Sequence, residues 1–167
     1  SDGWRLRSLA LPGQIRIAGA LVCDERTGEV LLFGGTVRNE PVAETWVWNG
    51  SDWRKRFPAA APPRRWGAAA TYDARRGRVV LFGGIGGPSG SIPLGDTWEW
   101  DGSSWSELDV AVSPSPRSDA SMIYDANHQA LIIQGGQGDT GLRDMWRWDR
   151  ERRTWRPIGI PEVSPVQ

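Results

Sequence analysis

Apolar and polar residues follow one another along this chain in short runs that recur three times. In each repeat, a run of large or β-branched apolar residues ends at a pair of glycines, as in EVLLFGG, RVVLFGG and ALIIQGG. Tryptophans then alternate with a variable residue at positions 46–48, 98–100 and 146–148. Strict alternation places both indoles on one face of a strand, whereas a continuous apolar run of this length is typical of a strand buried on both faces. The pattern therefore predicts an all-β chain.

Two further segments complete each repeat. A stretch of small and apolar residues precedes the glycine-ending run, at positions 18–22, 67–72 and 120–124. Each repeat ends at a closing tryptophan, and the three closing tryptophans are Trp53, Trp105 and Trp155. Asn-Gly and Asp-Gly pairs before the first two of these are strong signals for a tight hairpin turn. Each repeat thus predicts four antiparallel strands, which we name a, b, c and d in chain order.

The spacing of the repeats predicts how these strands assemble. The glycine pairs begin at Gly34, Gly83 and Gly135, so they recur after 49 and 52 residues. Repeats of about 20 to 50 residues are typical of solenoids and propellers, in which each unit packs against its neighbours. Three units are fewer than the roughly four to eight blades that close a propeller. We therefore expect an open arc, completed by further repeats of a longer chain or by a second copy.

The repeats also divide the chain. Three units are predicted at residues 14–57, 58–109 and 110–157. Residues 1–13 contain SDGWRLR, which matches SDWRKR around Trp53, and they predict the outer strand d of a preceding or partner blade followed by a connector. Residues 158–167 are predicted to be a tail or a connector to a further blade.

The order of glycine pair, tryptophan pair and closing tryptophan resembles the kelch family over about residues 14–157, and residues 72–105 resemble its bacterial variety closely. The resemblance implies kelch-type β-propeller blades of four antiparallel strands, of which three are visible here as a half or partial propeller. Two such arcs would give six blades, a common number in the family. The third unit departs from the pattern at Gln134 and Met145, where the other units have phenylalanine and threonine. This departure affects a local contact rather than the fold.

Composition argues against several classes of function. The 167 residues include 20 basic and 20 acidic side chains, and a net charge of zero provides no field that would attract nucleic acid or an anionic membrane. No apolar run is long enough for a membrane span. The single histidine, His128, lies in a predicted hairpin turn, and with Cys23 it cannot form a conventional imidazole or thiolate metal site. We expect no enzyme activity, no catalytic residue, no metal and no cofactor.

Three arginines are candidates for binding. Arg16, Arg65 and Arg117 each stand 18 residues before the first glycine of a pair, at the entry to strand a. Arginines repeated around a ring would form a cationic collar that could bind carboxylate or phosphate groups in a bidentate manner. Acids recur with equal regularity, at Glu44, Asp96 and Asp144. An arginine–carboxylate pair between blades is therefore the structural alternative to a ligand site.

Trp66 and the connections between strands are the remaining candidates. Trp66 has no counterpart in the other two units, so it is free to contact either a ligand or a neighbouring blade. The b–c connections, at residues 36–43, 85–95 and 137–143, differ in length beside a regular scaffold. Such loops on a rigid scaffold commonly carry binding residues.

These patterns favour a noncatalytic recognition or scaffold module. It would bind a protein or another polar ligand through its b–c and d–a loops, and it would self-associate as a homodimer to complete a six-bladed ring. The alternative is a fragment of a larger kelch enzyme or carbohydrate-binding protein whose active residues lie outside this segment. Nine of the eleven tryptophans occupy repeated strand positions, where packing between blades explains them without a sugar ligand.

Overall fold

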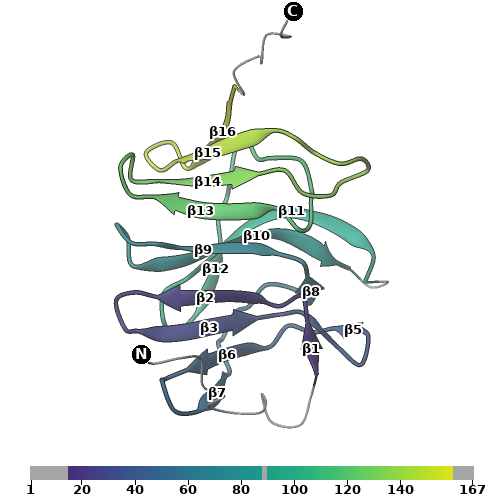
Figure 1. The fold of residues 1–167 in the computed structure, drawn as a ribbon, viewed down its shortest axis with the longest axis vertical. Helices are drawn as coiled ribbons and strands as arrows, with labels where there is room; N and C mark the ends of the chain where they lie inside the picture. Colours follow the sequence, from purple (N-terminus) through teal and green to yellow (C-terminus); the bar gives the residue numbers. More distant parts are fainter. Residues whose placement is uncertain (1–14, 88–89, 160–167) are drawn as a thin grey trace, which may run out of the picture.

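All regular structure in the described part of the chain is β. The computed structural model describes residues 15–87 and 90–159, and in these ranges sixteen strands form four antiparallel sheets (Figure 1). The prediction of an all-β chain is confirmed. None of these sheets closes on itself, and none of the described residues forms a helix that could cross a membrane. The outer strand predicted around Trp4 lies outside the described residues.

Three larger sheets follow the three repeats, and in each of them strands a, b, c and d are neighbours in that order. Sheet 1 consists of β2 (Ala20–Asp24), β3 (Glu29–Phe33), β6 (Thr45–Trp48) and β7 (Trp53–Arg56). Sheet 2 consists of β9 (Ala69–Asp73), β10 (Arg78–Gly86), β11 (Ile92–Trp100) and β12 (Trp105–Glu107), with β8 (Arg65–Trp66) paired to the far end of β10. Sheet 3 consists of β13 (Ser121–Asp125), β14 (Ala130–Gln134), β15 (Met145–Asp149) and β16 (Thr154–Ile158).

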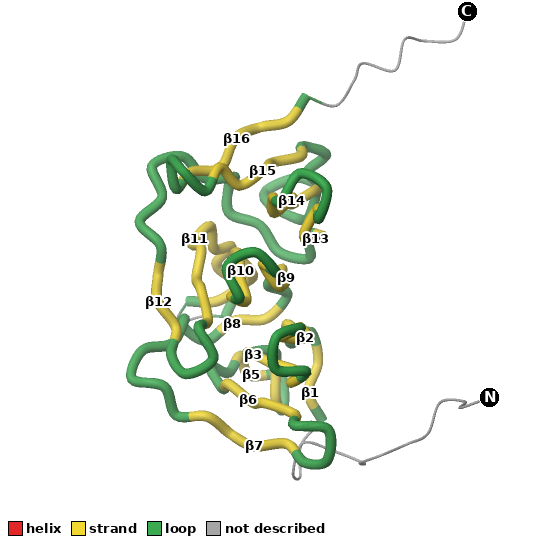
Figure 2. The backbone as a smooth tube through the Cα atoms, turned by 90° about the vertical axis from the view of Figure 1, so that its left-hand side faces the viewer, coloured by secondary structure: helices red, strands yellow, loops and turns green. Residues whose placement is uncertain are grey.

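The three sheets stand beside one another and diverge from strand a towards strand d. The first strands are neighbours, because β9 lies against both β2 and β13. The last strands, β7, β12 and β16, are spread apart on the opposite side (Figure 2). Ala20 and Ala69, both buried, occupy the start of β2 and β9. Side chains of this size let neighbouring first strands approach closely.

The glycine pairs bend strand b at the point where the next unit touches it. The register of β10 with β11 shifts between Phe82 and Gly84. All six paired glycines have positive φ, between 63° and 100°. A Cβ on Gly83 would stand 2.5 Å from the carbonyl oxygen of Arg117, which belongs to the next unit. Glycine is therefore required at position 83 for two reasons: the backbone has a positive φ, and the next unit approaches too closely for a Cβ.

Beyond the bend, each unit continues into a second, smaller structure at one rim. In the first unit this is a separate sheet of β1 (Arg16–Ile17), β4 (Thr36–Val37) and β5 (Glu40–Pro41). In the second unit it is the far ends of β10 and β11 together with β8. In the third unit only bridges from Gln137 to Ser118 and Gly141 remain. The predicted b–c loops are thus hairpins, because their backbones pair with the segment that enters strand a.

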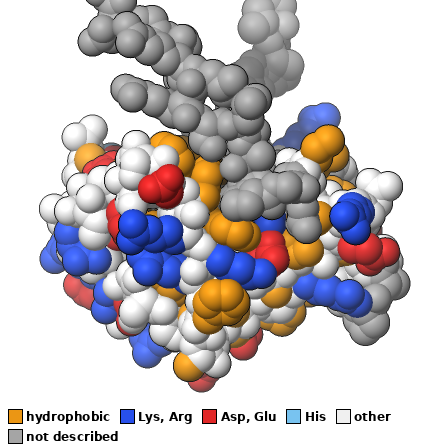
Figure 3. Space-filling model, turned by 90° about the horizontal axis from the view of Figure 1, so that it is seen from below, with side chains coloured by type: hydrophobic (Ala, Val, Ile, Leu, Met, Phe, Trp, Pro, Cys, Tyr) orange, Lys and Arg blue, Asp and Glu red, His pale blue; other side chains and the backbone are white. Residues whose placement is uncertain are grey.

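The hydrophobic core lies between the sheets rather than within one of them. One cluster joins sheets 1 and 2 and includes Ala20, Val22, Leu31, Phe33, Val47, Tyr72, Val79, Leu81, Trp98, Trp100 and Trp105. A second joins sheets 2 and 3 and includes Ala69, Val80, Phe82, Leu108, Leu131, Ile133, Trp148 and Trp155. Strand b of the middle sheet contributes to both clusters, as its continuous apolar run predicts. Towards solvent, at the sheet 1 end, hydrophobic, basic and acidic side chains are mixed (Figure 3).

The closing tryptophans of the second and third units connect each of these units to the one before it. Trp105 is 2% exposed, its Nε1 donates a hydrogen bond to Thr45 Oγ1 at 3.0 Å, and its ring centroid lies 5.1 Å from that of Phe33. Phe33 and Thr45 are a cross-strand pair of sheet 1. The same contacts recur one unit further along, between Trp155 Nε1 and Thr97 Oγ1 at 3.2 Å and between the Trp155 and Phe82 rings at 5.8 Å. We call the cross-strand phenylalanine and threonine the tryptophan seat.

Candidate functional site

Arg65 forms a buried bidentate ion pair with Asp96. Its Nη1 and Nη2 donate to Asp96 Oδ1 and Oδ2 at 2.6 and 2.7 Å. The same guanidinium donates to the carbonyl oxygens of Gly83 at 2.9 Å and Pro63 at 3.0 Å, and the Arg65 side chain is 0% exposed. Because β8 runs back along the end of β10, the arginine lies beside the bend of strand b. It holds together three segments of one unit.

The other two units repeat this arrangement. Arg117 Nη1 and Nη2 donate to Asp144 Oδ1 and Oδ2 at 2.6 and 2.8 Å, and Nη1 also donates to the carbonyl of Gly135 at 3.0 Å. In the first unit Arg16 donates to Glu44 and to the carbonyl of Gly34, and Lys55 forms a second ion pair with Glu44. Each pair lies inside one unit. The expectation of a pair between blades was wrong, because the segment entering strand a folds back over its own hairpin.

The backbone of two of these arginines makes the contact between units. The N–H of Gly35 donates to the Arg65 carbonyl at 2.8 Å, and the N–H of Gly84 donates to the Arg117 carbonyl at 2.8 Å. Arg65 and Arg117 therefore each hydrogen-bond to the bend of their own unit through the side chain and to the preceding unit through the backbone carbonyl. This accounts for the regular spacing of arginine and glycine pair.

Hydrogen bonds and charge keep the paired acids ionised. Burial alone would raise the pKa of Asp96, but the Arg65 guanidinium and the Trp98 indole N–H, 2.7 Å from Asp96 Oδ2, hold it below its usual value. Arg117 lowers the pKa of Asp144 in the same way. Burial of Glu44 also acts to raise its pKa, and bonds from Lys55, Trp46 and Arg16 outweigh this and lower it from 4.5 to about 2.

These contacts limit what the three arginines can bind. The side chains of Arg65 and Arg117 are 0% exposed, and that of Arg16 is 6% exposed. An anionic ligand could reach a guanidinium of this kind only by displacing the carboxylate that it already binds. The structure brings each candidate arginine to an acid of its own unit, which favours the structural alternative over an open cationic collar.

Trp66 lies on β8 opposite Ile85 of β10. Its indole Nε1 donates to the carbonyl of Gly90 at 3.4 Å, and the residue is half-buried. It thus contacts the rim hairpin of its own unit, and part of its surface is open to solvent. Its role in ligand binding stays a prediction.

Two cavities lie at the rim that carries the hairpins. The larger, of about 460 Å³, is between the middle of β11 and the connector from sheet 2 to sheet 3, and its polar lining includes Asp96, Glu107, Asp109 and Ser113. The second, of about 370 Å³, lies between the rim hairpins of the second and third units. Its lining includes Pro93, Ser115, Pro116, Asp139, Thr140 and Leu142. Residues 108–116, the d–a connector, line both cavities.

This connector is fastened to the sheets on either side of it. Ser113 Oγ donates to the carbonyl of Gly95 at 3.0 Å. The backbone N–H of Trp155 donates to the carbonyl of Val112 at 2.9 Å, and Thr154 Oγ1 bonds the same residue. The cavities are therefore bordered by a segment that hydrogen bonds fix to sheets 2 and 3. The d–a loops were predicted to be binding elements, but no residue in them was singled out. The Ser-Pro-Ser-Pro run at 113–116 was the signal in the sequence that could have identified this connector.

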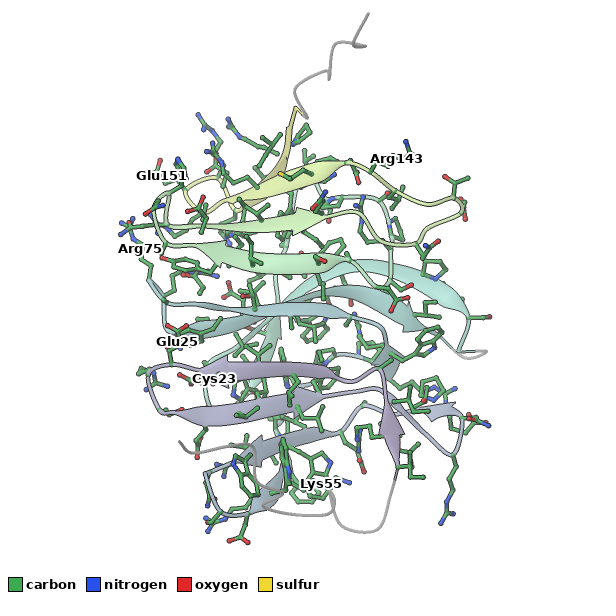
Figure 4. The ribbon with its side chains drawn as sticks, in the orientation of Figure 1. Cys23, Glu25, Lys55, Arg75, Arg143 and Glu151 are labelled. Carbon is green, nitrogen blue, oxygen red and sulfur yellow. The ribbon has the colours of Figure 1, made fainter. Side chains whose placement is uncertain are left out.

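The opposite rim carries the a–b and c–d turns. Figure 4 shows Glu25, Arg75 and Glu151 there, and Arg143 at the hairpin rim. A third cavity, of about 270 Å³, is bordered by His128 and Glu151 among others. His128 is exposed in its turn, as the sequence predicted, with Nδ1 2.6 Å from Asp125 Oδ2.

Within residues 15–87 and 90–159, no group of three or more histidine, cysteine, aspartate and glutamate side chains is placed to hold a metal ion. No protein-family model matches the sequence, and no curated protein is significantly similar to it.

Proposed function

We propose that this chain is a noncatalytic recognition module of kelch type, which binds a protein partner at its hairpin rim. The rim consists of the b–c hairpins and the d–a connectors. The observation that carries the proposal is the connector at residues 108–116, which is fastened to two sheets and lines both rim cavities. A segment that is already ordered can bind a partner without the free-energy cost of ordering a loop.

Charge gives the proposed partner a preferred chemistry. Asp96 in the larger cavity is already paired with Arg65. Glu107 and Asp109, both exposed, are the remaining acids of the lining. They give this cavity a negative character in a chain whose net charge is zero. We propose that a partner segment places a basic side chain here and apolar or hydroxyl groups against Pro93, Pro116 and Leu142 in the second cavity.

The proposal is tested with two labelled peptides of opposite charge. Binding of fluorescein-labelled hexa-arginine and hexa-glutamate is measured by fluorescence anisotropy at about 0.15 M salt, where long-range attraction is screened. Hexa-arginine is expected to bind more tightly. The double variant Glu107→Gln, Asp109→Asn should weaken its binding about fivefold, as loss of exposed charge pairs predicts.

A matched control removes the same charge from the opposite rim. The double variant Glu25→Gln, Glu151→Gln changes two acids at the turn rim (Figure 4) and should leave hexa-arginine binding unchanged. Equal binding of the two peptides, or equal weakening by both double variants, would refute the proposed rim site.

A further inference from the structure

Sheets 1 and 3 each have one face that no other sheet covers in the described part of the chain (Figures 1 and 2). The two internal junctions between sheets show which kinds of face pack together. At both internal junctions, the tryptophan face of one sheet packs on the seat of the preceding sheet. The uncovered face of sheet 1 corresponds to a tryptophan face, and that of sheet 3 corresponds to a seat.

The tryptophan face of sheet 1 already has the geometry of its buried counterpart. Trp48 and Trp53 have ring centroids 5.8 Å apart at an interplanar angle of 49°. The equivalent Trp100 and Trp105 of sheet 2 are 5.5 Å apart at the same angle of 49°. Both tryptophans of the sheet 2 pair are buried and Trp105 contacts the seat of sheet 1, whereas Trp48 and Trp53 are half-buried. Sheet 1 therefore presents a formed tryptophan face to a preceding sheet.

Sheet 3 has the backbone of a seat but different side chains. Gln134 and Met145 form a cross-strand pair. This pair is equivalent to Phe33 with Thr45 in sheet 1, and sheet 2 pairs Phe82 with Thr97 in the same way. Gln134 is exposed and Met145 is half-buried. The third unit thus lacks both side chains that receive a closing tryptophan.

The chemistry of this replacement opposes a tryptophan of the same kind. Threonine accepts the indole N–H through its hydroxyl, whereas a methionine thioether is a weak acceptor. An indole N–H buried without an acceptor is unfavourable. Gln134 also puts a polar amide where Phe33 and Phe82 make ring contacts. We propose that the tryptophan face of sheet 1 binds a β-sheet face that carries a phenylalanine–threonine seat, and that Gln134 and Met145 exclude a second copy of this chain from that role.

The backbone of sheet 3 remains suited to docking, which makes the proposal testable by two substitutions. Gly35 and Gly84 donate their N–H groups to a carbonyl of the following unit. Among the described residues, no carbonyl oxygen accepts a hydrogen bond from the N–H of Gly136, the equivalent glycine of the third unit. Selectivity would then depend on the two side chains of the seat. This inference does not depend on ligand binding at the hairpin rim.

The experiment rebuilds the seat in one protein and supplies the tryptophan face from another. The seat variant carries Gln134→Phe and Met145→Thr together with Trp53→Ala, so that it cannot bind its own copies through Trp53. Mixed with the wild-type chain, it should form a one-to-one complex of about twice 18.5 kDa by light scattering. Neither protein alone should exceed 18.5 kDa at the same concentration.

Two controls keep the outcome decisive. Glu151→Phe adds an aromatic ring at an exposed turn outside the seat and should capture no wild-type chain. If Trp53→Ala prevents folding, the variant with only Gln134→Phe and Met145→Thr should instead associate with itself in a concentration-dependent manner. Association of wild-type copies that Trp53→Ala abolishes, or no association with a folded rebuilt seat, would overturn the proposal.

Discussion

At the residue scale, one arginine in each unit does several structural tasks. Arg65 pairs with Asp96, fixes the carbonyl of Gly83 at the bend, and accepts the N–H of Gly35 from the preceding unit. Its guanidinium is unexposed and its charge is matched by a neighbouring carboxylate. A buried charge of this kind is tolerated only while its partner is present.

Replacing Arg65 by alanine should therefore destabilise the protein. It leaves the Asp96 carboxylate without its cation, and loss of one partner of a buried pair costs about 3–5 kcal/mol in the free energy of unfolding. Urea denaturation measures this loss. Arg54→Ala, at an exposed position of β7, should change the free energy of unfolding by no more than about 0.5 kcal/mol. A stable Arg65→Ala protein that only lost affinity for anions would instead support the cationic collar.

Glu44 makes stability depend on pH in an acid window. Its pKa in the folded protein is about 2, below the ordinary value of 4.5. A lowered folded-state pKa stabilises the protein above about pH 4.5, and this contribution is lost as pH falls towards about 2. The urea midpoint of the wild type should thus fall more between pH 6 and pH 3 than that of Glu44→Gln. Identical falls for the two proteins would contradict this assignment.

At the scale of strands and turns, the repeated sequence predicted most of what the structure shows. Alternating tryptophans identified β6, β11 and β15, and continuous apolar runs identified β3, β10 and β14. The sequence placed the glycine pairs at the ends of the apolar runs, but the carbonyl oxygen that Gly34 and Gly83 approach belongs to a neighbouring unit. Such a contact has no local signature in the sequence.

The rim hairpins and the tryptophan seat could not be predicted from the sequence, because each depends on a contact with another segment of the chain. β4 and β5 have two residues each, too few for any periodicity, and they form because β1 lies alongside β4. The seat joins Trp105 to Thr45 across 60 residues of sequence. The sequence did mark Gln134 and Met145 as departures, and only the packing shows that both belong to one site.

Substitution of Gly83 separates its two roles. Gly28 has a φ of 71°, and a Cβ there would meet no atom within 4 Å. Gly28→Ala should therefore lower the free energy of unfolding only by the strain of the left-handed conformation, about 1 kcal/mol. Gly83 has a φ of 63°, and its Cβ would stand 2.5 Å from the Arg117 carbonyl oxygen. Gly83→Ala should cost about 1–3 kcal/mol more than Gly28→Ala. Equal thermal stability of the two variants would show that sheets 2 and 3 do not meet at this glycine.

At the scale of the whole molecule, the sheets are joined in one direction. Each internal junction places a tryptophan face on the seat of the sheet before it. The described part of the chain then ends in a tryptophan face on sheet 1 and an altered seat on sheet 3. This polarity argues against a ring made of two identical copies, because the two uncovered faces do not match.

The most direct test of this polarity is the solution mass of the wild-type chain across a wide concentration series, measured by light scattering. We predict a constant mass of 18.5 kDa. A mass that rises to about twice this value, and returns to 18.5 kDa in Trp53→Ala, would show that copies complete one another through the tryptophan face and would contradict the proposed polarity.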